Sequence, residues 1–475
     1  MTTKLLAATC YPTLPQCIEA CSSLNVMLMR NYLFAAAVMP RLGGRATVFG
    51  WRLAAALALV CGGAVADVAQ AASSNDDDAP INGGNLLQTA MIDGRAWKLR
   101  ARVGALYDSN INRTIDGEAA ARLSPLLSFG AGMPLGRQQL FFGAEYGRDI
   151  VFTQERLNRG RNGIGGGVAW RVGAACSGVV GAERFQRLSV VTEQADLVNN
   201  VQTGVNVAGS IGCRTPTGIG FGGSVEHRTA SNDLAVRTPF DLRSTVFAPN
   251  ISYGTPNLGQ FSLTASFNST SYPNRSVPTV DGIVDDGIKI FSGRVGYQRK
   301  FGSRLQLALG ASLLKTTPNP NTQLAIANNQ VVSVTRDDFS GSGYDISVDY
   351  TPSTRLAFNF LASRNVQVSP NVGALFVIRS NFGADVTYRM NPAMSFAMGG
   401  QLIKSSYKQS FSSPGESARI SDNAKRFFAS VDYSPVKLYT LQLEVRHQLR
   451  RSDPIAYNFD STSVRLNLIV NLGRG

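Results

Sequence analysis

The chain has 475 residues, of which 16% are charged, well below the roughly 25% of a typical soluble protein. Glycine is abundant, with 47 residues, and the mean hydropathy of −0.02 excludes both a disordered polyelectrolyte and a helical membrane protein. With only two His in the chain, a His-rich metal site is excluded, and we predict neither a metal nor a cofactor. This composition favours a β-rich protein.

The N-terminal region has the pattern of an export leader. Arginines precede the apolar run 53–65, and a small-x-small string suited to cleavage follows it. We therefore predict a leader with a signal peptide over 1–71 and a polar periplasmic linker over 72–94, with a buried soluble helix as the alternative. Because Met29-Arg30 begins a more usual leader, the true start is expected to be internal, at Met29 or Met39.

The first segment after the linker alternates with a period of two residues, which predicts a strand between two opposite environments. One face carries Trp97, Leu99, Ala101, Val103, Ala105 and Tyr107, and the other carries mainly Lys98, Arg100, Arg102, Gly104 and Asp108. A strand from Trp97 to Tyr107 spans about 33 Å, or about 25 Å of height at a tilt near 40°. This height matches the apolar band of an outer-membrane barrel.

The same alternation recurs at residues 261–268, 305–313, 356–362, 441–446 and 463–470. Alternation alone does not distinguish a membrane barrel from a soluble sandwich, because strands of both folds have one apolar face. The connections distinguish them, and they alternate strictly between short turns and long polar segments. All short turns then lie on one side of the sheet, as in a transmembrane barrel, whereas a Greek-key sandwich mixes connection lengths.

Short turns follow strand ends marked by Tyr253, Tyr297, Tyr350, Tyr388 and Tyr433. Together with Trp97 and Tyr107, these tyrosines are the predicted membrane-interface aromatics. The long polar segments between them are roughly 230–243, 273–287, 316–342, 365–375, 408–422 and 449–460. They are the predicted extracellular loops.

We predict an all-β fold, a transmembrane antiparallel up-and-down barrel over 95–475. The count is 18 strands, with 16 as the alternative, and either number leaves an aqueous lumen. The strands are expected at approximately 96–108, 121–133, 139–152, 162–173, 179–190, 201–211, 218–229, 244–253, 260–271, 288–299, 305–315, 340–350, 356–364, 376–388, 394–407, 423–433, 438–448 and 461–472.

Loss of the leader would leave Cys176 and Cys213 as the only cysteines, in an oxidising compartment. The strand assignment places them in the neighbouring periplasmic turns 174–178 and 213–217. We predict a disulfide between them, with two unpaired thiols as the alternative. The remaining chain keeps a net charge of about +11, which disfavours a nucleic-acid partner for an exported protein and favours an anionic one.

Basic side chains are expected to face the lumen where the last strand closes on the first. Lys98, Arg100 and Arg102 should lie beside Arg465 and near Arg446, and Glu444 is available to pair with them. Such a stripe would favour anions. The alternative is that these charges only keep the interior hydrated.

Enzymatic chemistry is not indicated. The string 218–223 resembles a dinucleotide-binding loop, but it continues into a strand rather than a helix. His227 and His447 have no accompanying nucleophile or carboxylate cluster in the sequence. We therefore predict no catalytic residue.

The string 103–113, Val-Gly-Ala-Leu-Tyr-Asp-Ser-Asn-Ile-Asn-Arg, resembles the opening of the β-barrel porin type 2 family of Gram-negative outer membranes. The strand rhythm through residue 472 is similar as well. The resemblance implies an outer-membrane barrel, in many members associated with exopolysaccharide production and export, without catalytic residues.

The sequence is compatible with two functions. The first is a porin-like outer-membrane channel for anionic solutes or a growing exopolysaccharide. The second is a non-conducting structural or adhesion barrel whose loops bind partners. Expected partners are outer-membrane lipid and lipopolysaccharide, the barrel-insertion machinery and polysaccharide, with no nucleic acid.

Overall fold

The computed structural model describes residues 97–188, 200–327, 330–336, 338–369, 374–408 and 420–474. The predicted leader and linker lie outside the described residues, so both stay predictions. Within the described part of the chain, no helix is both long and apolar enough to cross a membrane.

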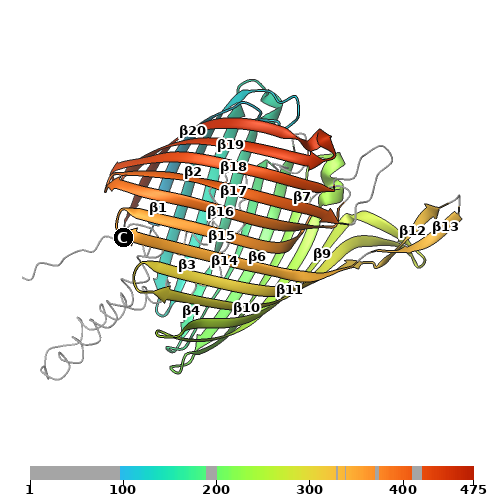
Figure 1. Cartoon of the computed structure of the whole chain (residues 1–475), viewed down its shortest axis with the longest axis horizontal. Coiled ribbons are helices and arrows are strands. Elements are labelled where there is room, and N and C mark those ends of the chain that lie inside the picture. Colours follow the sequence, from blue (N-terminus) through green and yellow to red (C-terminus); the bar gives the residue numbers. More distant parts are fainter. Residues whose placement is uncertain are drawn as a thin grey trace, which may run out of the picture. The chain divides into compact units, whose positions relative to one another are not determined.

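Eighteen antiparallel strands form one closed sheet, in which β20 returns to pair with β1 (Figure 1). This confirms the predicted barrel and the count of 18 rather than 16. The barrel strands are β1 (Trp97–Asp108), β2 (Ala120–Leu135), β3 (Gln138–Val151), β4 (Arg159–Val172), β5 (Cys176–Leu188), β6 (Val201–Arg214), β7 (Ile219–Asn232), β8 (Leu242–Thr255), β9 (Gly259–Thr279), β10 (Gly282–Phe301), β11 (Leu305–Asn319), β14 (Phe339–Ser353), β15 (Leu356–Val368), β16 (Phe376–Asn391), β17 (Met394–Lys408), β18 (Ser421–Val436), β19 (Tyr439–Asp453) and β20 (Phe459–Arg474).

Further elements lie in the long connections on one side of the barrel. The strands β12 (Thr322–Ala327) and β13 (Gln330–Thr335) form a separate hairpin within the predicted loop 316–342. Short 3-10 helices are η1 (Glu155–Leu157), η2 (Ala235–Phe240) and η3 (Ile455–Tyr457). Because short turns are periplasmic in outer-membrane barrels, the side with these elements is the extracellular side.

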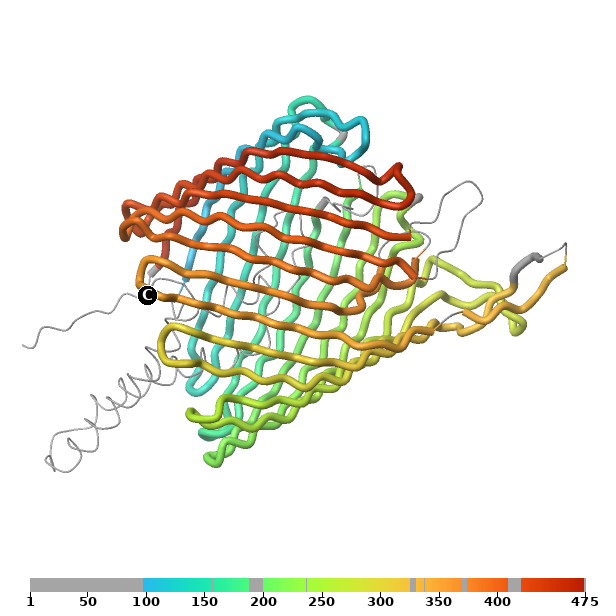
Figure 2. Tube along the Cα trace, viewed as in Figure 1, coloured from blue at the N-terminus to red at the C-terminus, as the bar shows by residue number. Residues whose placement is uncertain are grey.

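Two strands are much longer than the sequence predicted. The strands β9 and β10 have 21 and 20 residues, and they absorb the polar segment 273–287 that was expected to be a loop. Figure 2 shows their hairpin extending past the extracellular rim next to the β12–β13 hairpin. The predicted strands ended where the apolar alternation ends. The backbone pairing of β9 with β10 nevertheless continues through the polar residues to Thr279 and Gly282.

Strands also continue past the tyrosines that were expected to end them. The strand β14 runs to Ser353 beyond Tyr350, and β18 runs to Val436 beyond Tyr433, each with a register shift in between. Each shift contains a proline, Pro352 or Pro435. Because proline has no N–H to donate to the ladder, it suits these irregular positions.

The two faces of the sheet have opposite chemistry. On β1, Val103 and Tyr107 are 45% and 54% exposed, whereas Leu106 and Asp108 are almost fully buried. Apolar side chains such as Leu263, Leu313 and Met398 lie exposed on the outer face. An oily exterior around a charged interior is the reverse of a soluble sandwich and suits a barrel in lipid.

The predicted interface aromatics lie on this outer face. Trp97, Tyr107, Tyr253, Tyr350, Tyr388 and Tyr433 are exposed. Tyr297 is half-buried because its ring packs at 4.7 Å from that of Phe261 and its hydroxyl donates to the Leu258 carbonyl at 3.1 Å.

Candidate functional site: the lumen and its extracellular mouth

The inner face of β19, β20, β1 and β2, here named the seam sector, is strongly basic. Its inward cations are Lys98, Arg100, Arg102, Arg122, Arg446, Arg450 and Arg465, and its inward acids are Asp108 and Glu444. Glu444 pairs with Arg446 at 3.0 Å on the same strand. Among the described residues of these four strands, the inward cations therefore outnumber the inward carboxylates.

The inner face of β14 to β18, here named the aspartate sector, has a different charge balance. Its inward carboxylates are Asp345, Asp349, Asp385, Asp422 and Asp432, together with the cations Arg379, Arg389 and Arg426. Arg294 of β10 donates from Nε to Asp345 at 2.7 Å, and the Asn359 amide donates to Asp385 at 2.7 Å. The lumen wall therefore changes from mainly basic to mainly acidic around its circumference.

The predicted basic stripe is more dispersed than the sequence indicated. Leu106, not Lys98, Arg100 or Arg102, stands opposite Arg465. Arg102 lies four positions before Leu106, about 13 Å along the strand. The direct cross-strand neighbour of Arg465 on its other side is Glu444. The five predicted cations, Lys98, Arg100, Arg102, Arg446 and Arg465, do lie on the inner face. The prediction that the three cations of β1 lie beside Arg465 was wrong, because alternation assigns a residue to a face but does not fix the register between strands.

The two cysteines lie in strands rather than turns. Cys176 is the first residue of β5 and stands directly opposite Cys213 of β6. The structure joins them in a disulfide at the periplasmic rim. The strand β5 begins at Cys176 and β6 ends at Arg214, so both strands include the cysteines that the sequence assigned to turns.

Neither histidine faces the lumen. The ring of His227 lies on the outer face beside Thr245, with Nδ1 at 2.9 Å from its hydroxyl. His447 lies on the outer face as well, with Nδ1 at 3.0 Å from the Thr462 hydroxyl and Nε2 at 3.7 Å from Asp460. Both imidazoles therefore lie on the opposite face of the sheet from the polar groups of the lumen.

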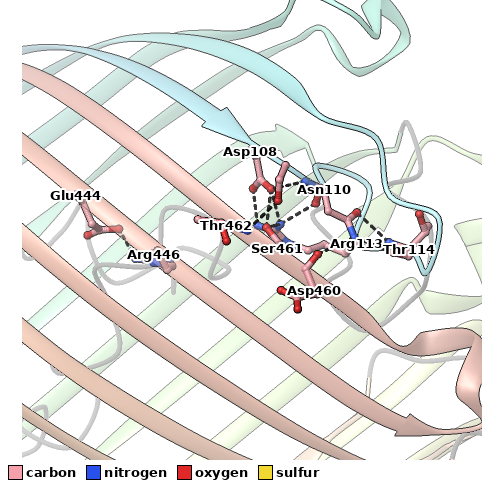
Figure 3. A network of polar contacts seen from close by, with 10 residues as sticks. Asp108, Asn110, Arg113, Thr114, Glu444, Arg446, Asp460, Ser461 and Thr462 are labelled. Carbon is pink, nitrogen blue, oxygen red and sulfur yellow. Dashed lines mark hydrogen bonds and ion pairs between the residues drawn. The ribbon is translucent and has the colours of Figure 1, made fainter.

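A polar network, here named the seam clasp, ties β1 to β20 at the extracellular end (Figure 3). Asp108 is 1% exposed, and its Oδ1 accepts hydrogen bonds from the backbone N–H of Asn110 at 2.9 Å, Arg113 at 2.9 Å and the Ser461 hydroxyl at 2.6 Å. Arg113 also reaches the other carboxylate oxygen at 2.9 Å. The loop after β1 is thereby attached to the last strand.

The asparagine of this clasp satisfies backbone groups on both sides of the seam. Its side-chain amide donates to the Thr114 carbonyl at 2.7 Å and to the Asp460 carbonyl at 3.1 Å. Arg113 adopts a positive φ of 58°, a conformation that non-glycine residues seldom adopt. The Asp-Ser-Asn string that carried the family resemblance therefore has a physical role, closure of the barrel, which the sequence alone did not reveal.

The extracellular ends of β15 and β16 leave the barrel wall and fold inward. The pairing of β14 with β15 extends only to Tyr344 and Arg364. The buried Tyr272 of β9 donates its hydroxyl to the Ser369 carbonyl at 3.1 Å, although β10, β11 and β14 lie between β9 and β15 in the wall. This hydrogen bond therefore crosses the inside of the mouth.

An apolar cluster stabilises the same inward fold. Ile288 and Ile290 of β10 are buried with Leu375 and Phe376, and the rings of Phe339 and Phe376 lie 5.9 Å apart. Burial of such side chains contributes roughly 1.5–3 kcal/mol each. The segment on either side of 370–373 thus occupies part of the extracellular entrance.

A second buried aspartate lies at the base of the β9–β10 projection, in a group here named the hairpin clasp. Asp286 is 1% exposed and pairs with Arg275 at 2.6 Å and Arg336 at 2.8 Å. The Arg275 guanidinium also lies 3.8 Å from the centre of the Tyr272 ring. Burial lowers the pKa of Arg336, and the charge of Asp286 offsets part of that effect.

A closed 18-stranded barrel with an apolar exterior, short periplasmic turns and a charged lumen defines an outer-membrane β-barrel protein of the porin type. The protein therefore resides in the outer membrane of a Gram-negative bacterium. Residues 326–472, from the β12–β13 hairpin into β20, match the family described as Putative beta-barrel porin 2. This match confirms the resemblance noted in the sequence.

Several solved structures are similar over most of the chain at low identity. Pseudomonas aeruginosa OccK2 (OpdF), in complex with glucuronate, is 9% identical with a TM-score of 0.44, covering 80% of this chain and 97% of that one. The outer membrane protein opdK of the same organism is 11% identical with a TM-score of 0.42, covering 79% and 98%. The FrpB iron transporter of Neisseria meningitidis (F3-3 variant) is 9% identical with a TM-score of 0.45, covering 77% and 63%. No curated protein sequence matches the chain.

Proposed function

We propose that the barrel is a diffusion channel that passes anionic solutes across the outer membrane. The observation that carries the proposal is the seam sector, where the cations on the inner face outnumber the carboxylates on the same strands. Fixed positive charge along a water-filled path raises the local concentration of anions and lowers that of cations. No step of this function requires a cofactor or a catalytic group.

Charge neutralisation in the seam sector tests the proposal. The double substitution Arg100→Gln and Arg102→Gln should lower the anion-to-cation permeability ratio several-fold, measured as the reversal potential across a planar bilayer under a salt gradient. The matched control replaces Arg148 and Arg184, two exposed arginines on the outer face, with Gln, and should leave the ratio unchanged. An unchanged ratio in the lumen variant would reject the basic sector as the selectivity element.

The non-conducting barrel is the second function, and the inward fold at the mouth is the observation that favours it. Ser369, Leu375 and Phe376 occupy part of the entrance. Single-channel recording of the refolded protein separates the two functions. Stable conductance supports the channel, and none at any voltage supports an adhesion or structural barrel.

An exopolysaccharide cargo stays a prediction, as does recognition by the barrel-insertion machinery. A polyanionic chain would meet the same basic sector as a small anion. Deletion of the gene followed by assay of extracellular polysaccharide tests the cargo, and an unchanged yield would remove it.

A further inference from the structure

A polar and basic row crosses the outer face of four neighbouring strands near the extracellular rim. Arg364 of β15, Ser380 of β16, Lys404 of β17 and Asn423 of β18 are direct cross-strand partners in turn. Two residues nearer the periplasm, the corresponding row is Ala362, Phe382, Leu402 and Lys425. The outer surface therefore changes from largely apolar to cationic and hydrogen-bonding within one step of the pleat.

This row borders a groove of about 640 Å³, whose lining adds Lys408, Ser406 and Ser421, with Phe339 and Ile378 as apolar members. The groove exists because the ends of β15 and β16 leave the wall beyond Arg364. It is therefore a consequence of the same inward fold that narrows the mouth, seen from the outside of the barrel.

The cations of the groove are available to a ligand. Among the residues that the structure describes, no carboxylate lies within ion-pair distance of Arg364, Lys404 or Lys408. The one acidic residue in the lining, Asp422, is 3% exposed, and its oxygens accept hydrogen bonds from Tyr407 and Ser452 at 2.8 and 2.7 Å. The surface offered to the outside is positive.

The depth of the row fits the headgroup level of the outer leaflet. Ser380 lies eight residues along β16 from the girdle residue Tyr388, which is about 20 Å of height for a strand tilted near 40°. Exposed Phe382 and Leu402 directly below would contact acyl chains. A ligand with an anionic group at the interface and hydrocarbon chains beneath it would match the cationic row and the apolar side chains below that row.

We propose that this groove binds a phosphate group of an outer-leaflet glycolipid, lipopolysaccharide. A phosphate monoester carries close to two negative charges and several acceptor oxygens. The Arg364 guanidinium can donate two parallel hydrogen bonds, the lysine ammonium groups supply point charges, and the serine hydroxyls and the Asn423 amide donate the remainder. The site is independent of conductance, so it stands whether or not the barrel is a channel.

The test is binding of diphosphoryl lipid A to the refolded full chain in neutral detergent, followed by native mass spectrometry. The triple variant Arg364→Ser, Lys404→Ser and Lys408→Ser should weaken binding at least ten-fold. The matched control, Arg184→Ser, Lys289→Ser and Lys315→Ser, removes the same charges from exposed positions on the outer face elsewhere and should bind within two-fold of the parent. Heat-modifiable migration in gel electrophoresis verifies that each variant is folded.

Two further probes identify the source of the phosphate. Lipid A stripped of phosphate should bind at least ten-fold more weakly than the diphosphoryl form, and inorganic phosphate at millimolar concentration should not displace it. Equal binding of the stripped lipid, displacement by free phosphate, or an unaffected triple variant would each overturn the proposal.

Discussion

The seam clasp and the hairpin clasp both depend on a buried aspartate–arginine pair, but they stabilise different parts of the extracellular mouth. Each has a buried aspartate paired with arginine: Asp108 holds Arg113 of the loop after β1, whereas Asp286 holds Arg275 of β9 and Arg336 of the segment after β13. The seam clasp lies within the wall and attaches the first strand to the last. The hairpin clasp holds segments that extend past the wall, and its carboxylate contacts two guanidinium groups rather than one. A buried carboxylate thus serves either to close a sheet or to fix a projection, according to where its arginines originate.

The largest effect is expected at the hairpin clasp. Asp286→Asn leaves two largely buried guanidinium groups facing a neutral amide, and loss of one member of a buried ion pair costs about 3–5 kcal/mol. Limited proteolysis should show the β9–β10 projection and the β12–β13 hairpin opening far more often. The control Asp285→Asn removes the same charge from an exposed neighbour and should be within about 0.5 kcal/mol of the parent. Equal cleavage rates in both variants would contradict the role of Asp286.

A smaller effect is expected at the seam. Asp108→Asn loses charge-assisted hydrogen bonds to Arg113 and Ser461, worth about 2 kcal/mol, but keeps an acceptor for the backbone N–H of Asn110. Hydrogen exchange should accelerate at the extracellular ends of β1 and β20 and stay unchanged at their periplasmic ends. The exposed Asp116→Asn is the matched control. Uniform acceleration along both strands would show global destabilisation instead of seam fraying.

The smallest effect concerns the contact that joins the projection to the inward fold. Tyr272→Phe removes one hydrogen bond to Ser369, worth about 1 kcal/mol, while the ring remains beneath Arg275. Hydrogen exchange at 366–369 should rise about five-fold, and single-channel records should show more frequent current steps. Tyr344→Phe, on the outer face, is the control and should change neither measurement. A silent Tyr272→Phe variant would mean that the apolar cluster alone holds the inward fold.

The barrel was predictable from the sequence because lipid imposes a simple pattern. Period-two alternation with girdle tyrosines located the wall strands, and the contrast of short and long connections gave their direction. The sequence did not reveal the inward fold of β15 and β16, because Leu375 and Phe376 continue the apolar pattern of a wall strand. It also gave no register, so Arg465 was misplaced relative to Arg102. The seam clasp depends on the contact of Asp108 with Ser461, 353 positions away, and the hairpin clasp on that of Asp286 with Arg336, 50 positions away; one sequence carries no signal for either.

The bond between Cys176 and Cys213 has a consequence for assembly. It lies at the open, periplasmic end of the β5–β6 hairpin, opposite the connection that joins the two strands. A covalent link there prevents the strands from sliding past each other, and a slip of one residue would turn every lipid-facing side chain toward water. Once the disulfide has formed in the periplasm, the β5–β6 hairpin would enter the membrane with the register of its two strands already fixed.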